Sequence, residues 1–299
     1  KIIALFSQIY ASFASIKGSL PAFNSIKDDF ILFENISDYK NKEQNHKNFE
    51  FKDKIKISNL NFSYLNKDIS QSNRRLNLEN INLDISANTA VGITGKTGSG
   101  KSTLVDLILG FIKPNSGQIT VDGNSVLDGK SLMNWRNCIS YVPQKVFLSD
   151  DTIISNICFG QDKGKINYEL FKKSLQISNL EKFVESLDDK ENTKIGENGI
   201  MISGGQSQRI GIARAIYQNK DVLILDEATN QLDIETENNI LKNLKKINKT
   251  IILITHRINT LKSLDKIIFI KDKKIYSDDN FSNTLDANVY FKNLSKLDK

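Results

Sequence analysis

The sequence contains few residues that could cross-link it, because only 2 of its 299 residues are cysteines. Cys138 and Cys158 fit neither the paired pattern of a disulfide framework nor the spacing of zinc ligands, and both have apolar neighbours. We therefore expect two small buried thiols in a reducing cytoplasm. A disulfide-stapled secreted fold is not expected.

A long uncharged hydrophobic run is also missing. The N-terminal stretch from Ile2 to Ile16 carries no charge, but it is shorter than the roughly 20 residues that cross a bilayer core. It begins a series of apolar residues in steps of three and four, which predicts a helix: Ile2, Phe6, Ile9, Phe13, Ile16, Leu20, Phe23, Ile26, Phe30 and Phe33. Two origins stay open on these residues alone. The helix is either the cytoplasmic end of a transmembrane helix or an amphipathic helix that packs in a soluble dimer.

No block of basic residues is present, although the net charge is +6. The lysines are scattered among acidic residues, which is typical of a solvated surface, so no nucleic-acid partner is expected. A hydrophobic content of 39% and a charged content of 25% are ordinary for a globular chain and exclude wholesale disorder. A signal peptide is not expected, because the first residues lack a charged segment followed by a small-residue cleavage site.

The remaining sequence is divided by a polar stretch without periodicity, residues 38–50, which indicates a linker. We accordingly expect three parts: a helix with its extension at 1–37, the linker, and a larger domain at 51–299.

In the larger domain, short apolar runs bounded by polar residues or glycine alternate with helical patterns. Such runs are typical of strands buried on both faces, and they occupy residues 90–93, 139–142, 222–225 and 251–254. One helical pattern consists of Ile240, Leu241, Leu244 and Ile247. The alternation predicts an α/β fold with a mainly parallel sheet. Earlier apolar alternations at 55–62 and 81–85 predict antiparallel strands of a small β subdomain around a polar hairpin at 65–77.

A phosphate-binding loop follows the strand that ends at Ile93. The segment fits G-x-x-x-x-G-K-[ST] between a strand and a helix that begins near Ser102, which is the context that this motif requires. Its backbone N–H groups and the helix N-terminus would bind phosphates, while Lys101 would reach the β and γ phosphates and Ser102 would ligate Mg²⁺. The expected site consists of Gly95, Lys96, Thr97, Gly98, Ser99, Gly100, Lys101 and Ser102, with Thr103 as a further phosphate contact.

Two carboxylates follow the predicted strand at 222–225. Ligands of open α/β sheets bind at the carboxyl ends of the strands, so Asp226 is suited to hold Mg²⁺ and Glu227 to orient or deprotonate the attacking water. His256 follows a second buried run, at 250–255, and should reach the same edge as a γ-phosphate contact. We therefore assign catalysis to Glu227, His256 and Lys101.

Residues 202–209, Ile-Ser-Gly-Gly-Gln-Ser-Gln-Arg, resemble the signature motif of the ATP-binding-cassette (ABC) family. The resemblance covers about residues 55–275 and implies a P-loop NTPase core with an antiparallel β subdomain and an α-helical subdomain. It also implies that Ser203, Gly204, Gly205 and Gln206 form a second anion-binding nest, at the start of a helix from 206 to 217, for the ATP of a partner subunit. Two subunits, identical or paralogous, would then close head to tail around two nucleotides.

Other residues are assigned through the same resemblance. Tyr64 is similar to the aromatic residue that stacks on adenine, Gln144 to the glutamine that ligates Mg²⁺, Asp233 to the loop that couples the two sites, and His256 to the switch histidine. Asn230-Gln231 departs from the family's common Ser-Ala, so altered loop contacts are expected. Asn88 and Lys273 stand at positions where the family frequently has turn glycines. Such positions favour a positive φ, which Asn tolerates and Lys adopts less readily.

The exporter branch of the family is indicated by three segments: 196–199, Gly-Glu-Asn-Gly; 152–156; and Ser19-Leu-Pro within the first helix. This resemblance implies that the first helix is the end of a transmembrane domain. The implied function is ATP-driven translocation or flipping of a lipid, an oligosaccharide-lipid, a peptide or a drug-like substrate at the inner membrane, with the ATPase domain on the cytoplasmic side. The alternative is a soluble ABC-type ATPase that acts on nucleic acid or ribosomes.

Overall fold

The computed structural model describes residues 2–40, 51–64, 77–196 and 202–287. The chain divides into two units, Lys1–Asn48 and Phe49–Lys299. Most of the expected linker, the hairpin residues 65–76 and positions 197–199 of the exporter-like segment lie outside the described residues.

The first unit consists of the helix α1 (Ile2–Lys40), which continues through Pro21. Its large apolar side chains from Ile2 to Ile26 are exposed. None of the helices in the described part of the chain combines the length and the apolar character that a membrane span needs.

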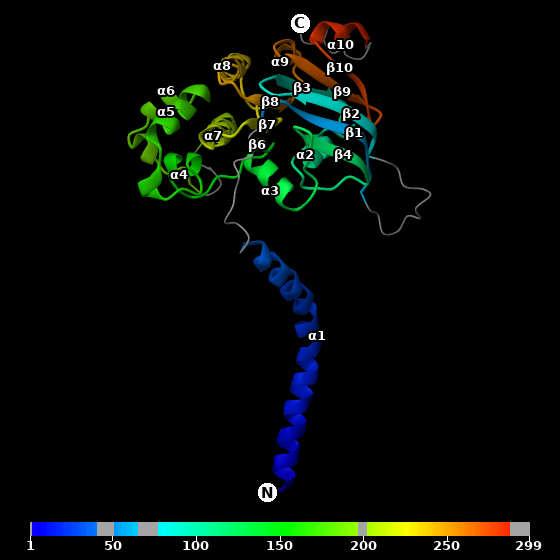
Figure 1. Cartoon of the computed structure of the whole chain (residues 1–299). Helices are drawn as coiled ribbons and strands as arrows, with labels where there is room; N and C mark the ends of the chain where they lie inside the picture. The colour runs from blue at the N-terminus through cyan, green and yellow to red at the C-terminus, as the bar shows by residue number, and fades with distance from the viewer. Residues whose placement is uncertain (1, 41–50, 65–76, 197–201, 288–299) are drawn as a thin grey trace. The chain divides into compact units, whose positions relative to one another are not determined.

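The second unit contains two sheets (Figure 1). The first is antiparallel with the order β2-β1-β4-β5 and confirms the predicted β subdomain. Its strands are β1 (Lys54–Phe62), β2 (Leu78–Ser86), β4 (Ser116–Val121) and β5 (Asn124–Ser125). In β1 the pairing shifts between Ile57 and Leu60, where Asn59 has φ 48°, which explains why the apolar alternation changes step there.

The second sheet has the order β10-β9-β3-β8-β7-β6. All of its pairs are parallel except the β9–β10 hairpin, which confirms the predicted mainly parallel sheet. Its strands are β3 (Ala90–Gly95), β6 (Ile139–Val142), β7 (Val222–Asp226), β8 (Thr250–Ile254), β9 (Lys266–Lys271) and β10 (Lys274–Asp279). Asn88 and Lys273 have φ 57° and 68°, as expected at turn positions that favour glycine.

The helices that pack on the sheets are α2 (Lys101–Ile108), α3 (Gly129–Asn137), α8 (Ile234–Leu244), α9 (Ile258–Lys262) and α10 (Phe281–Ala287). Helices α4 (Ile153–Ile157), α5 (Tyr168–Ile177), α6 (Glu181–Glu185) and α7 (Gly204–Tyr217) gather to one side of the sheets (Figure 1). These four helices bury an apolar cluster of their own that includes Phe171, Leu175 and Ile210. They form the helical subdomain that the family resemblance implies.

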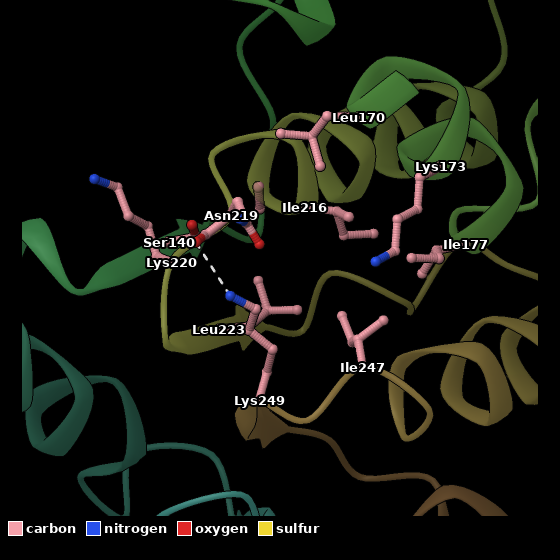
Figure 2. A pocket seen from close by; sticks show the side chains of 11 residues that line it. Ser140, Leu170, Lys173, Ile177, Ile216, Asn219, Lys220, Leu223, Ile247 and Lys249 are labelled. Atoms are coloured by element: carbon pink, nitrogen blue, oxygen red, sulfur yellow. Dashed lines mark hydrogen bonds between the residues drawn. The ribbon is translucent and has the colours of Figure 1, made fainter. Parts of the chain in front are cut away.

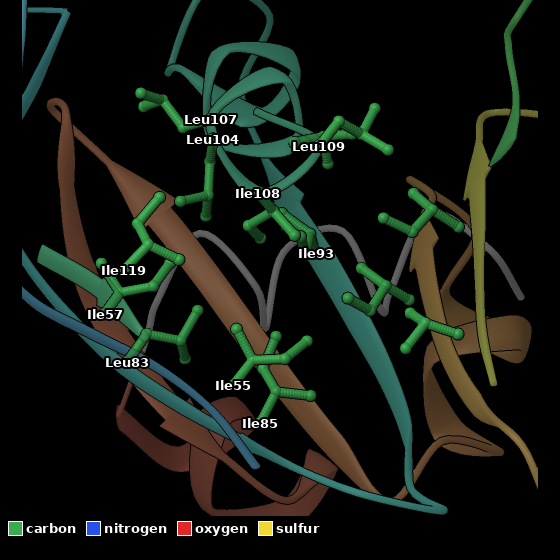
Figure 3. Packing of buried hydrophobic residues seen from close by; sticks show 14 of the residues in the cluster. Ile55, Ile57, Leu83, Ile85, Ile93, Leu104, Leu107, Ile108, Leu109 and Ile119 are labelled. Atoms are coloured by element: carbon green, nitrogen blue, oxygen red, sulfur yellow. The ribbon is translucent and has the colours of Figure 1, made fainter. Parts of the chain in front are cut away.

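Alternate residues of the parallel strands face two different cores, as the period of two in a strand dictates. Figure 3 shows one core, where Leu104 and Ile108 of α2 lie with Ile93 above apolar residues of the antiparallel sheet. Leu223, Leu225 and other alternate residues pack on α7, α8 and α9 instead. Both faces of β7 and β8 are therefore covered, and only their carboxyl ends reach the functional edge.

Two helix boundaries differ from the prediction. Helix α7 begins at Gly204, two residues before the expected start, because Ser203 caps it. Helix α8 ends at Leu244, so Ile247 lies beyond the helix, although it still packs on the same core. The spacing of apolar residues indicates which side of a helix is buried. It does not indicate the residue at which the helical hydrogen bonds end.

Candidate functional site

The loop between β3 and α2 has a backbone that only glycine tolerates at its key positions. Gly95, Gly98 and Gly100 have φ 149°, 75° and 108°. A Cβ on Gly95 would collide with the Ile270 carbonyl oxygen, and one on Gly100 would lie 2.6 Å from a methyl carbon of Leu78. Substitution at either position would displace the loop.

The Lys101 side chain crosses this loop. Its ammonium donates to the carbonyl oxygens of Gly95, at 2.9 Å, and Lys96, at 3.1 Å, and the residue is only 6% exposed. Burial lowers the pKa of Lys101, and the negative charges of Glu227 and Asp226 oppose this shift. The structure therefore brings the loop lysine and both predicted carboxylates into one electrostatic site.

The loop and the first turn of α2 present polar groups that are available to bind a ligand. Ser99 Oγ is buried and makes no hydrogen bond with any atom of the described residues. Ser102 is exposed in the first turn of α2, where Thr103 is half-buried, and the free N–H groups of that turn attract anions. An orphaned hydroxyl beside a glycine-shaped loop fits a phosphate oxygen as the missing partner.

The β7 strand ends in Asp226 and then turns sharply. Glu227 has φ 49°, an unusual conformation for a residue with a side chain, and its N–H donates to the Ile254 carbonyl at the end of β8. The two neighbouring strand ends, with Glu227 after one and His256 after the other, are thereby joined by a hydrogen bond. This is the edge of the sheet that the sequence predicts for the site.

Three side chains converge on the Glu227 carboxylate. Gln144 Nε2 donates to Oε2 at 2.7 Å, Asn230 Nδ2 donates to the same oxygen at 3.0 Å, and His256 Nε2 lies 3.2 Å from Oε1. The predicted residues Gln144, Glu227 and His256 thus lie together. Gln144 contacts the carboxylate through its amide nitrogen, and its role as a metal ligand stays a prediction. Both carboxylate oxygens are held in one orientation.

Asp226 is half-buried at the end of β7. Burial raises its pKa, while a hydrogen bond from Tyr141, at 3.3 Å, lowers it and the Glu227 charge raises it. Burial and the neighbouring Asp226 also raise the pKa of Tyr141, so this hydroxyl remains a donor. A carboxylate with one donor keeps lone pairs for a cation.

Tyr64 is connected to the phosphate loop through Asn77. The Tyr64 N–H donates to Asn77 Oδ1 at 3.2 Å, and a Cβ on Gly100 would lie 2.9 Å from the Asn77 carbonyl oxygen. Tyr64 is 51% exposed, and its ring packs edge-on against Phe62. A ring with a free face beside a phosphate loop is suited to stack on a base.

The signature segment begins α7. The Ser203 side chain accepts from the Gln206 N–H at 3.2 Å, and Gln206 Oε1 accepts from the Ser203 N–H at 2.7 Å. Gly204 and Gly205 have no positive φ. The expected nest is therefore a capped helix N-terminus, where the anion-binding groups are the first N–H groups of α7.

The signature segment shares an open cavity of about 550 Å³ with the loop after β7. Its lining includes Ser203, Gly204, Gly205 and Asp233. Asp233 caps α8, and hydrogen bonds from Thr236 lower its pKa. The structure thus brings Asp233 to the signature motif rather than to Glu227.

A separate cavity lies at the opposite ends of the strands (Figure 2). It is lined by Ser140 and Leu223 near the starts of β6 and β7, with Ile177 and Ile216 from α5 and α7. Because Asp226 and Glu227 stand at the carboxyl ends, this cavity is not part of the candidate site.

Sequence reasoning missed two groups of contacts. Tyr141 was not predicted to reach Asp226, although it stands three residues before Gln144 on the same strand and loop. For Asn230 the sequence predicted only altered loop contacts. Its side-chain amide is a hydrogen-bond donor three residues after a carboxylate, and this was the signal that could have placed it next to Glu227. Among the described residues, no cluster of three or more His, Cys, Asp or Glu side chains could hold a metal by itself.

Comparisons with known proteins agree with this geometry. Residues 78–230 match the family model described as ABC transporter. The chain is 34% identical over 281 residues to an ATP-dependent lipid A-core flippase of Aliivibrio fischeri, covering 90% of this chain and 47% of that protein. It is 39% identical over 225 residues to a multidrug resistance-like ATP-binding protein of Buchnera aphidicola, covering 74% of this chain and 38% of that protein.

A solved structure is also similar. It is that of a bacterial Atm1-family ABC exporter with ATP bound, with a TM-score of 0.75 and 27% sequence identity, covering 83% of this chain and 42% of that one. The chain spans less than half the length of these relatives. With the family model matched across the phosphate loop, the signature motif and the carboxylate strand, the chain belongs to the ABC transporter family.

Proposed function

We propose that this chain is the ATP-hydrolysing part of an ABC exporter. The observation that carries the proposal is the Glu227 carboxylate, which is oriented by Gln144, Asn230 and His256 and acts electrostatically on Lys101 of the phosphate loop. A carboxylate held in this way can polarise a water molecule for attack on a terminal phosphate.

ATP would occupy the loop between β3 and α2. The loop N–H groups, the Ser99 hydroxyl and the first turn of α2 supply donors, and Lys101 would exchange its loop carbonyls for β and γ phosphate oxygens. Tyr64 would stack on the adenine ring, with Thr103 as a further phosphate contact. His256 would contact the γ-phosphate from the next strand end.

The residues present also fit Mg²⁺. This cation prefers oxygen ligands and is usually held by one or two carboxylates together with substrate phosphates, and Asp226, Ser102 and Gln144 offer a carboxylate, a hydroxyl and an amide oxygen. When bound, Mg²⁺ would neutralise charge on the phosphates. Asp226, with its one donor from Tyr141, is suited to face the cation while Glu227 faces water.

The partner would be a second ABC subunit, and the assembly would reside in a membrane. Ser203, Gly204, Gly205 and Gln206, together with Asp233, would close on the nucleotide of that subunit. The exposed apolar side chains of α1 support an origin of residues 1–37 in a membrane domain. Relatives are named as a lipid A-core flippase and as a multidrug resistance-like protein, so lipid, oligosaccharide-lipid, peptide and drug-like cargo all fit, at the inner membrane with ATP used on the cytoplasmic side.

Replacing Glu227 with Gln tests the proposal. The variant keeps the size of the side chain but cannot take up a proton, so steady-state ATP hydrolysis should fall at least about 100-fold. Binding of a fluorescent ATP analogue should persist, and size exclusion with ATP should reveal a trapped dimer. Glu235→Gln, on the exposed face of α8, is the matched control and should hydrolyse ATP as the parent does. Parental turnover in Glu227→Gln would assign the base to another residue.

A further inference from the structure

The turn after β7 orients Asn230 toward Glu227 in two ways. Its side-chain amide donates to Glu227 Oε2 at 3.0 Å, and its backbone N–H donates to the Glu227 carbonyl oxygen at 3.2 Å. The second bond closes a tight turn from 227 to 230, so the amide reaches the carboxylate without a long, flexible side chain. Asparagine can donate here, whereas aspartate of the same shape cannot.

The main chain of Asn230 is fixed from the other side by a buried ionic network. Arg257 Nη2 donates to the Asn230 carbonyl oxygen at 2.9 Å, and Arg257 Nη1 donates to Glu237 Oε2 at 2.6 Å. Thr229 Oγ1 donates to the other oxygen of Glu237 at 2.6 Å, and Glu237 is 2% exposed. A buried carboxylate with both oxygens satisfied is a rigid anchor, so this network holds the Asn230 main chain beside Glu227.

The next residue connects the turn to the signature helix. The Gln231 N–H donates to Gln208 Oε1 at 2.9 Å, and the Gln231 side chain occupies the space that a Cβ on Gly204 would need. Gln208 is buried in α7. The Asn230-Gln231 pair therefore contacts the catalytic carboxylate with its first residue and the signature segment with its second.

We propose that Asn230 is a positioning residue for ATP hydrolysis. Its amide, together with Gln144 and His256, fixes the orientation of the Glu227 carboxylate, and the Glu237 network holds the main chain that carries the amide. Such a carboxylate loses activity when its orientation is lost, because a general base must reach its water within hydrogen-bond distance. The inference rests on the proposed role of Glu227.

The experiment compares Asn230→Asp with Asn230→Ala in steady-state ATP hydrolysis. Asn230→Ala removes the donor, and kcat should fall about threefold to tenfold, because Gln144 and His256 remain. Asn230→Asp keeps the shape but directs a negative charge at Glu227, so its kcat should fall at least as far. KM for ATP should stay within about twofold in both variants, because the hydrogen bonds of Asn230 in the described structure go to Glu227 and Arg257 and not to the phosphate loop. Asn239→Asp, on the exposed face of α8, is the control and should match the parent.

A residue that only filled space would give the opposite ranking. Asn230→Asp would then keep nearly parental kcat while Asn230→Ala lost it, and this result would overturn the inference. Equal activity of the parent and both variants would also overturn it. Glu227→Gln is measured alongside: if it is inactive while Asn230→Asp is fully active, only the role of Asn230 fails, and if Glu227→Gln is active, the proposed function itself fails.

Discussion

Glu227 combines a costly backbone with a well-satisfied side chain. A left-handed φ of 49° costs a residue with a Cβ roughly 1–2 kcal/mol. The hydrogen bond to Ile254 and the donors Gln144 and Asn230 hold the residue in this conformation. Backbone strain that surrounding contacts hold in place is frequent at functional sites. Here it accompanies a carboxylate that acts electrostatically on Lys101 of the phosphate loop.

Cys138 gives the molecule a stability term that depends on alkaline pH. Burial raises the pKa of its thiol to about 11, above the value of about 8.5 in an unfolded chain. The folded state therefore favours the neutral thiol. The contribution is fully present below about pH 8.5 and is lost as the pH rises through 11.

As the pH rises from 8.5 to 11, the unfolding free energy of the Cys138→Ala variant should consequently fall less than that of the parent. The difference in unfolding free energy between parent and variant should shrink by about 2 kcal/mol across this range, measured by urea unfolding. Val126→Ala creates a cavity in the same core without a titrating group, so its curve should stay parallel to that of the parent. A parallel curve for Cys138→Ala would contradict the argument.

The pattern of apolar residues predicts where the strands lie, but it predicts the contacts around the strands less well. The strands β3, β6, β7 and β8 were located from short apolar runs because both of their faces are buried. The phosphate loop and the two carboxylates followed from local spacing. The start of α7 was placed too late because a capping side chain, Ser203, decides it.

Contacts between distant segments were not predictable in the same way. Arg257 follows β8 and Glu237 lies in α8, so their ion pair depends on how α8 packs beside the strand ends. Gln231 meets Gln208 across an even wider sequence gap. A single sequence specifies which side chains can bond but does not specify which of them tertiary packing brings together.

The Glu237 network makes a prediction for the stability of the loop after β7. Glu237→Gln leaves an amide group where Arg257 or Thr229 needs an acceptor, so one donor of this buried cluster loses its partner. Because the Arg257 side chain keeps some exposure, 30%, the expected loss in unfolding free energy is about 2–4 kcal/mol. Glu235→Gln on the same helix should cost at most about 1 kcal/mol through the helix dipole. Urea unfolding of both variants measures the difference, and equal losses would show that the network contributes little.

The two elements of the chain that are suited to bind phosphate contact different groups. Lys101 interacts electrostatically with Asp226 and Glu227, whereas Ser203 shares its cavity with Asp233. The proposed nucleotide site, with the Glu227 carboxylate, is therefore separate from the signature surface. Head-to-tail pairing of two copies would supply each site with the surface that it lacks.

Pairing of this kind predicts that two inactive variants restore each other. Lys101→Ala removes the phosphate contact of a chain's own site, and Ser203→Arg blocks the signature surface that serves its partner, so each variant alone should hydrolyse almost no ATP. In a mixed pair, both lesions fall on one composite site, and the other combines an intact Lys101 with an intact Ser203. Random mixing of equal amounts makes half of the pairs mixed with one good site each, so about a quarter of the parental activity should return.

A mixture of Lys101→Ala with Glu227→Gln places a lesion in every site and should stay inactive. If the first mixture also stays inactive while both proteins still bind each other, the signature surface does not serve a partner's nucleotide in pairs of identical chains.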